Sequence, residues 1–119
     1  MEQSDSAALI HRMYSAFNRR AADEVLSYLH PGVHWPNGWE GGYLDGHQAV
    51  RDYWLRQWAV LDPEVIPLQL EWLPGDQVRV LVRQTVKDRD GNLLSAGNVN
   101  HVYTFDQHLI TTMTIESIE

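Results

Sequence analysis

The chain has 119 residues, of which 44% are hydrophobic and 21% are charged, and this length and composition predict a single domain over residues 1–119. Its net charge of −7 argues against nucleic acid or an anionic membrane as the main partner. The absence of cysteine excludes disulfides, thiolate nucleophiles and cysteine-ligated metals. The first residues lack a signal-peptide pattern, and no segment is apolar over the length of a membrane span, so we expect a cytoplasmic protein.

Two helices are predicted at the start of the chain. Asp5 and Ser6 can cap a helix, and the apolar side chains after them recur on one helical face until about Asn18. A second, short helix is predicted over about residues 22–29, because Pro31 and the glycine after it would stop it. The apolar residues that predict the first helix face are Leu9, Ile10, Met13, Tyr14 and Phe17.

A third helix is predicted after an unusually aromatic loop. Residues 33–35 are expected to form a very short strand, and the glycine-rich segment 36–46 is typical of a shaped loop. The helix should begin near Asp45 or Gly46 and end before Pro63. One face of it carries Ala49, Val50, Tyr53, Trp54, Trp58 and Leu61.

The second half of the chain alternates with a period of two, which predicts four antiparallel strands. Pro67 places the first of these strands at a sheet edge, and residues 74–76 turn the chain into the second. Residues 90–91, Asp-Gly, predict a two-residue hairpin loop. Residues 106–108 form the last turn, before a strand over residues 109–118 whose register stays open. The hairpin would pair Val80 with His101, Val82 with Val99, and Arg83 with Asn98.

These registers give the predicted sheet two different faces. The face that must meet the helices carries Ile66, Leu68, Leu70, Trp72, Val78, Val80, Val82, Val86, Val99, His101 and Tyr103. The opposite face is polar enough for solvent or for a hydrated dimer contact. It carries Gln69, Glu71, Arg79, Leu81, Arg83, Asn98, Asn100 and Val102.

Four segments carry a resemblance to a known family. They are Tyr14-Ser-Ala-Phe-Asn18, His30-Pro-Gly-Val-His-Trp35, Gly46-His-Gln-Ala-Val-Arg-Asp-Tyr-Trp54, and His101-Val-Tyr-Thr-Phe-Asp106 followed by Leu109-Ile110. In order and spacing the chain resembles the NTF2-like superfamily, in its small SnoaL-like or ketosteroid-isomerase-like branch, and partly a bacterial subgroup without an assigned reaction. The resemblance implies an α+β cone-shaped barrel, with three N-terminal helices packed on a curved, mainly antiparallel sheet. It also implies a homodimer through the outer sheet face.

Isomerases of this superfamily move a proton beside a carbonyl, with a carboxylate base and donors to the oxyanion. The resemblance places Trp35 at the position of the base, and indole cannot accept the proton. The oxyanion tyrosine falls closest to Met13, with Tyr14 one residue away, and the acidic donor falls at His101. The isomerase mechanism is therefore not supported as it stands. Three other residues could replace the base: His34, Glu40 and Asp45.

His101 is the main candidate for chemistry, with Tyr14 beside it, because the predicted register puts an imidazole among valines. The alternative is a core histidine that is hydrogen-bonded to Tyr14 or Gln84. Aromatic and apolar side chains could line a ligand pocket, although core packing, or dimer packing for Trp54 and Trp58, would explain them too. The candidates for a pocket are Met13, Phe17, Trp35, Trp39, Tyr43, Trp54, Val80, Val99 and Tyr103.

Two functions remain open from the sequence. The first is the binding of a small hydrophobic molecule, with cofactor-free isomerase, cyclase or hydratase chemistry in which His101 acts as acid or base. The second is a non-catalytic ligand-binding or dimerisation module. No compact metal-ligand spacing is present, so we expect neither a metal nor a cofactor.

Overall fold

A computed structural model describes residues 3–116, which form three helices and six strands. The helices and strands, in chain order, are α1 (Gln3–Asn18), α2 (Ala22–Ser27), β1 (Leu29–Pro36), β2 (Tyr43–Asp45), α3 (His47–Val60), β3 (Leu61–Leu73), β4 (Gln77–Asp88), β5 (Leu93–Asp106) and β6 (Leu109–Glu116). No helix in this part of the chain combines the length and the apolarity that crossing a bilayer requires.

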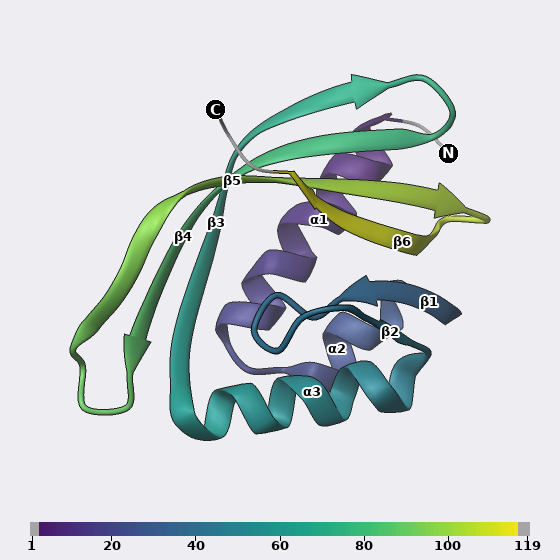
Figure 1. The fold of residues 1–119 in the computed structure, drawn as a ribbon. Coiled ribbons are helices and arrows are strands. Elements are labelled where there is room, and N and C mark those ends of the chain that lie inside the picture. The colour runs from purple at the N-terminus through teal and green to yellow at the C-terminus, as the bar shows by residue number, and fades with distance from the viewer. Residues whose placement is uncertain (1–2, 117–119) are drawn as a thin grey trace.

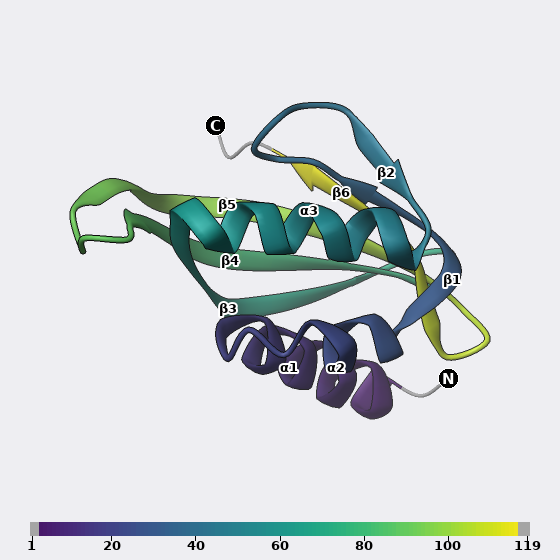
Figure 2. The same cartoon turned by 90° about the horizontal axis from the view of Figure 1, so that it is seen from below.

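The strands form one mixed sheet in the order β2-β1-β6-β5-β4-β3. Only β1 and β6 pair in parallel, and the other neighbours are antiparallel. The long strands β3, β4 and β5 bend strongly, and the sheet curves around α1 and α3 without closing (Figure 1). Seen from below, α3 lies in front of β4 and β5, while α1 and α2 lie beside each other (Figure 2). The α+β prediction, with three helices on a curved sheet, is confirmed.

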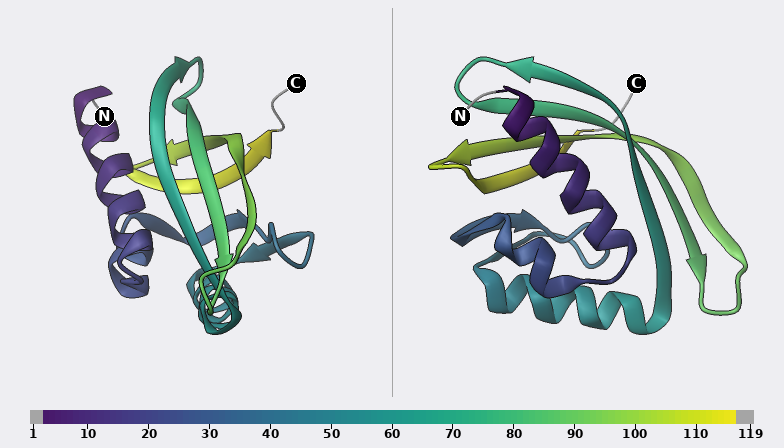
Figure 3. Two further views of the ribbon diagram at one scale, coloured as in Figure 1. Left: turned by 90° about the vertical axis from the view of Figure 1, so that its left-hand side faces the viewer. Right: turned by 180° about the vertical axis from the view of Figure 1, so that it is seen from behind.

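α1 presents the predicted face to the core. Leu9, Ile10, Met13 and Tyr14 are all buried. The helix already includes Gln3, so Asp5 lies in its first turn and does not cap it. The views from the side and from behind show α1 crossing the concave side of the sheet, with α3 at one end (Figure 3).

β1 is longer than the predicted strand over residues 33–35. α2 ends at Ser27, and the chain is already extended at Leu29. The register of β1 against β6 shifts between Leu29 and His34, so the Pro-Gly pair inside β1 lies in an irregular stretch of the strand. The loop over residues 36–46 also contains an unpredicted strand, β2, which pairs with the end of β1.

The pairing of β3 differs from the prediction and changes which of its side chains face the helices. Pro67 pairs with Val82 and Gln69 pairs with Leu81, so Leu68 is an extra residue in a bulge. One extra residue reverses the alternation of side chains along the strand. The prediction that Ile66 and Leu68 face the helices is therefore wrong, and both are exposed, while Val65 is buried.

The hairpin between β4 and β5 has the predicted register but a different loop. Val80 pairs with His101, Val82 with Val99, and Arg83 with Asn98, as predicted. The register shifts by one residue nearer the turn, so residues 89–91 form a three-residue loop. The carboxylate of Asp88 accepts hydrogen bonds from the backbone amides of Asp90 and Asn92 at 2.9 Å each, which favours the wider turn.

The pairing of β5 with β6 gives the register of the last strand, which the sequence left open. Tyr103 pairs with Met113 and His101 pairs with Ile115. β6 is described to Glu116, and the predicted end of the strand at Ile118 lies outside the described residues. His101 and Tyr103 therefore lie in the middle of a three-stranded part of the sheet, on its concave side, facing α1.

Candidate functional site

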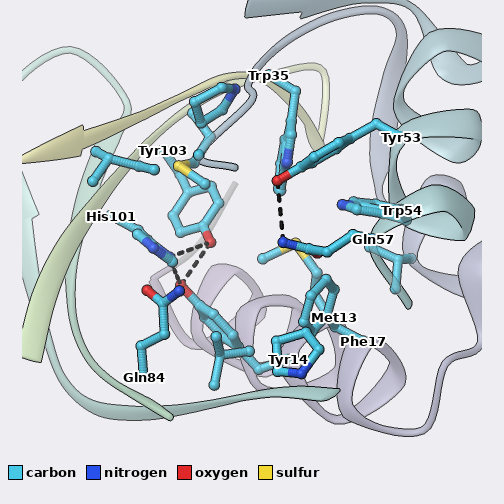
Figure 4. Close-up of a pocket in the computed structure, with 17 residues that line it drawn as sticks. Met13, Tyr14, Phe17, Trp35, Tyr53, Trp54, Gln57, Gln84, His101 and Tyr103 are labelled. Carbon is cyan, nitrogen blue, oxygen red and sulfur yellow. Dashed lines mark hydrogen bonds between the residues drawn. The ribbon is translucent and has the colours of Figure 1, made fainter. Parts of the chain in front are cut away.

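A cavity of about 260 Å³ lies between α1, α3 and the concave side of the sheet. Its wall is mostly apolar and aromatic, with a few polar side chains from different elements (Figure 4). The candidate residues from the sequence that line it are Met13, Tyr14, Phe17, Trp35, Trp54, His101 and Tyr103.

Three side chains in the wall form a buried hydrogen-bonded cluster. The hydroxyl of Tyr14 lies 2.8 Å from Nδ1 of His101 and 2.6 Å from the hydroxyl of Tyr103. Tyr14 comes from α1, whereas His101 and Tyr103 are neighbours on the same face of β5. The hydrogen bond between His101 and Tyr14, one of the two considered in the alternative of a core histidine, is present, so the sheet register and the helix face together build this cluster.

Burial keeps the cluster uncharged near neutral pH. Burial lowers the pKa of His101 to about 4, because an imidazolium loses hydration in this position. Burial, together with the charge and hydrogen bond of Tyr103, raises the pKa of Tyr14 well above its ordinary value. Burial also raises the pKa of Tyr103, against a smaller lowering by the hydrogen bond with Tyr14. The cavity therefore contains two phenols and a neutral imidazole.

The hydrogen bonds of the cluster can be donated in either of two directions. When Tyr103 donates to Tyr14, and Tyr14 donates to Nδ1 of His101, the imidazole proton is on Nε2. When Nδ1–H of His101 donates to Tyr14 and Tyr14 donates to Tyr103, the Tyr103 proton becomes available and Nε2 can accept. The same three groups can thus offer either a donor or an acceptor to a ligand.

Aromatic rings give the cavity a rigid apolar wall. Trp35 from β1 meets Trp54 from α3 edge to face, with ring centroids 5.7 Å apart. Phe17 from α1 also contacts Trp54 edge to face, at 5.9 Å. Trp54 is only 1% exposed and stacks on Trp58 at 5.9 Å, so these rings are part of the core as well as of the wall.

The side of the cavity formed by α3 carries two further polar groups, Tyr53 and Gln57. The amide of Gln57 donates to the hydroxyl oxygen of Tyr53 at 3.3 Å. Burial raises the pKa of Tyr53, and the backbone amides of Trp39 and Gly38 oppose this shift. The polar groups of the cavity therefore come from both sides, with the Tyr14 cluster on one and Tyr53 on the other (Figure 4).

Four predicted pocket residues do not line this cavity. Trp39 and Tyr43 are 41% and 50% exposed, because the loop turns their rings outward, and Tyr43 stacks on His34 with ring centroids 4.3 Å apart. Val80 is fully buried in the core and Val99 is half-buried beside it. The inward face of the sheet is larger than the cavity, so a side chain on that face does not necessarily line the cavity.

The three residues considered as replacements for a carboxylate base also lie away from the cavity wall. Nδ1 of His34 contacts Oδ1 of Asp45 at 2.6 Å in an exposed pair between β1 and β2. Glu40 forms an ion pair with Arg56 at 2.9 Å, and its hydrogen bonds to Arg56 and Asn37 lower its pKa. None of the described residues that line the cavity is Asp, Glu, Lys or Arg.

Sequence reasoning did not assign most of the remaining wall. Tyr53 and Gln57 are one helical turn apart on α3, a signal that could have placed both on one face. Gln84 is a polar residue at an inward position of β4, which was a second usable signal. The other wall residues are Val25, Pro36, Gly38, Pro63, Val65, Met113 and Ile115. Residues 3–116 contain no group of three metal-ligating side chains.

Comparisons with known proteins agree with this architecture. The profile of the SnoaL-like domain matches residues 10–113. An NTF2-like protein of unknown function from Burkholderia pseudomallei is similar with a TM-score of 0.83 and 22% identity, covering 99% of this chain and 92% of that one. TerC, co-crystallized with polyporic acid, is similar at 0.82 and 24% identity, covering 96% and 92%. A Mycobacterium tuberculosis protein in complex with estradiol-17β-hemisuccinate is similar at 0.81 and 14% identity, covering 96% and 94%. Curated proteins gave no significant match.

Proposed function

The chain belongs to the SnoaL-like family, and we propose from this premise that it binds a small, neutral, largely hydrophobic organic molecule in the cavity. The family and its structural neighbours support a small-molecule-binding or cyclase type of fold. The observation that carries the proposal for this chain is the aromatic wall interrupted by the uncharged cluster of Tyr14, His101 and Tyr103. An apolar wall with a few converging polar groups is typical of ligand sites.

The size of the cavity limits the ligand. An apolar cavity of about 150 Å³ holds a benzene molecule. A volume of about 260 Å³ therefore suits a molecule of roughly two rings. The steroid ester bound by the similar Mycobacterium tuberculosis protein is larger than that, so a steroid would have to extend through the mouth of this cavity. We favour a two-ring aromatic ligand.

The charge of the site selects a neutral ligand. A buried carboxylate or ammonium needs a partner of opposite charge, and none of the described wall residues is a charged side chain. The phenols and the neutral imidazole can instead bind a hydroxyl or carbonyl oxygen. Polyporic acid, with which TerC was co-crystallized, is also a small organic molecule, which supports a small organic ligand but neither its identity nor its neutral charge.

A second candidate function is cofactor-free proton transfer of the isomerase, cyclase or hydratase kind, with His101 as acid or base and Tyr14 as its partner. The contact of both side chains with the cavity favours it. An imidazole with a pKa of about 4 is a weak base near neutral pH, however, and Trp35 stands where the isomerase base would be. Binding without turnover is therefore the favoured function.

A thermal-shift measurement with two probes tests the binding proposal. Naphthol is neutral and has two rings, and naphthoate has the same ring system with a carboxylate. At about ten times its Kd, naphthol should stabilise the protein by about 1.4 kcal/mol and raise Tm by several degrees. Naphthoate should raise Tm much less, because its charge would have to be buried.

Two variants serve as controls for this measurement. Tyr14→Phe should reduce the naphthol shift, whereas Tyr43→Phe, on an exposed ring outside the cavity, should leave it unchanged. The proposal fails if naphthol gives no shift, or if naphthoate gives an equal one. Chemically altered ligand that accumulates in proportion to the protein, and not with His101→Ala, would instead establish the catalytic function.

We also propose a homodimer through the outer face of the sheet. Ile66, turned outward by the bulge in β3, lies opposite Arg83 on this face, and Arg83 lies opposite Asn98. A surface that mixes an exposed apolar side chain with polar ones is typical of a non-obligate contact. The cluster of Arg79 with Glu71 and Glu116 crosses the other end of the face, with distances of 2.6 and 3.0 Å.

A further inference from the structure

Tyr53 is a buried phenol that the binding proposal does not yet use. It is 4% exposed, lies on α3, and lines the cavity. Its hydroxyl points into the cavity from the side opposite His101 and Tyr103 (Figure 4). A buried hydroxyl normally has both a donor and an acceptor for its hydrogen bonds, so the partners of Tyr53 can be examined one by one.

The side chain that is hydrogen-bonded to the Tyr53 oxygen is a donor. Gln57 donates through Nε2 at 3.3 Å. The backbone of Gly38 and Trp39 lowers the pKa of Tyr53 against the rise that burial causes, as expected for donors to its oxygen, and the charge of Glu40 adds to the rise. Within residues 3–116, no carbonyl or side chain accepts the proton of Tyr53. With its lone pairs directed at donors, the hydroxyl has its proton left for an acceptor inside the cavity.

The surroundings of Tyr53 hold this arrangement in place. Asn37 fixes the adjacent loop, because its side-chain oxygen accepts the backbone amides of Trp39 at 3.2 Å and Glu40 at 2.7 Å. Glu40 in turn pairs with Arg56 on α3 at 2.9 Å. The loop is therefore joined to α3 without help from the Tyr53 proton, which leaves that proton free for another role.

We propose that Tyr53 is a specificity-determining donor, and that the ligand carries two oxygen functions, one at each end. One oxygen meets the Tyr14, His101 and Tyr103 cluster, and the other accepts a hydrogen bond from Tyr53. The ligand class is thus an elongated, neutral, two-ring molecule with a carbonyl, ether or hydroxyl oxygen on its far ring. This inference rests on the proposed function, since it names the chemistry of a ligand in the same cavity.

A matched pair of probes tests the role of Tyr53. Both are naphthols, and they carry a methoxy group or an ethyl group at the far end of the second ring. They differ by one oxygen at nearly equal size. The wild-type protein should bind the methoxy probe about five to ten times more tightly, as one hydrogen bond to a neutral acceptor is worth about 1 kcal/mol. Isothermal titration calorimetry measures both Kd values.

Three variants separate the donor from its neighbours. Tyr53→Phe should abolish the preference for the methoxy probe and leave the Kd of the ethyl probe nearly unchanged. Gln57→Leu should keep the preference, because Gln57 donates to Tyr53 and not to the ligand. Tyr103→Phe should raise the Kd of both probes by a similar factor, because both place the same naphthol hydroxyl at the cluster.

The outcomes that overturn the inference differ from those that overturn the function. If the ethyl probe binds and the wild type shows no preference, the role of Tyr53 is wrong while the binding function stands. The same holds if Tyr53→Phe keeps the preference, or if Gln57→Leu alone removes it. If neither probe binds the wild type, the binding function itself fails, and the inference fails with it.

Discussion

His101 is a buried titratable side chain in the wall of the cavity. It is buried on β5, it contacts Tyr14 through Nδ1, and burial lowers its pKa to about 4. Its charged form is disfavoured because no described carboxylate lines the cavity to offset the lost hydration. The same cost of burying an imidazolium that makes His101 a weak base also makes the stability of the folded protein depend on pH.

The stability of the protein should therefore fall between pH 6.5 and pH 4. The unfolded chain binds a proton at His101 with a pKa near 6.5 and the folded chain only near 4, so acid favours unfolding. The contribution is fully present above about pH 6.5 and is lost as the pH falls through 4, with a limit of about 3 kcal/mol. Urea unfolding at a series of pH values measures it.

The matched variant for this measurement is His101→Gln, which cannot titrate. It should lose less stability than the wild type between pH 7 and pH 4, by up to about 3 kcal/mol, because all other groups are shared. Parallel pH profiles for the two proteins would show that His101 does not titrate below its ordinary pKa. The comparison does not depend on the absolute stability of the variant.

At the scale of elements, the end of α1 is hydrogen-bonded to β3 at the edge of the sheet. Asn18, at the end of α1, donates through Nδ2 to the carbonyl of Val65 at 2.7 Å and accepts the backbone amide of Val65 at 2.9 Å. β3 is an edge strand, so part of its backbone has no partner strand. The side-chain amide of Asn18 pairs with the backbone of Val65 as a neighbouring strand would.

Replacing Asn18 should destabilise the protein more than its half-buried position suggests. Asn18→Ala removes both hydrogen bonds and should lower the free energy of unfolding by about 2 kcal/mol. Asn18→Asp keeps the acceptor but loses the donor and sets a carboxylate against a carbonyl, so it should be destabilising too. Urea unfolding measures both variants, with Ser15→Ala, an exposed position on the same helix, as a control that should change stability by less than about 0.5 kcal/mol. Equal stabilities for all three would contradict the bridging role.

At the scale of the whole molecule, the bend of the sheet separates two surfaces with different tasks. The concave side holds the cavity and is covered by α1 and α3 (Figure 3). The outer side is left uncovered by the three helices, and the bulge in β3 turns Ile66 onto it. The same local irregularity that brings Val65 to the cavity thus places an apolar side chain on the outer face.

The proposed dimer should be visible in sedimentation equilibrium as twice the mass of the chain. Ile66→Asp adds a charge to the outer face and should shift the equilibrium toward the monomer, because the charge would lose hydration in a contact. Leu55→Asp is the matched control, since Leu55 is similarly exposed but lies on α3, and it should leave the mass unchanged. A wild type that sediments as a monomer, or a dimer insensitive to Ile66→Asp, would contradict a contact through this face.

Much of the fold could be predicted because its signals are local. The helix face from Leu9 to Tyr14 follows from a period of 3.6, and the pairing of Val80 with His101 follows from alternation and a nearby turn. The bulge at Leu68 has no such signal. Whether an edge strand gains one residue depends on how its ends meet α3 and α1, which are distant in sequence.

The sequence by itself determined the order of the helices and of every strand except β2, and the register of the central hairpin, and it indicated Tyr14 as one of two possible partners of His101. Only the tertiary structure decided which side chains surround empty space. Tyr53, Gln57 and Gln84 join the cavity wall while Trp39 and Tyr43 turn to solvent. Periodicity reports which way a side chain faces along its own element, whereas a cavity depends on the distance between facing elements, which packing alone sets.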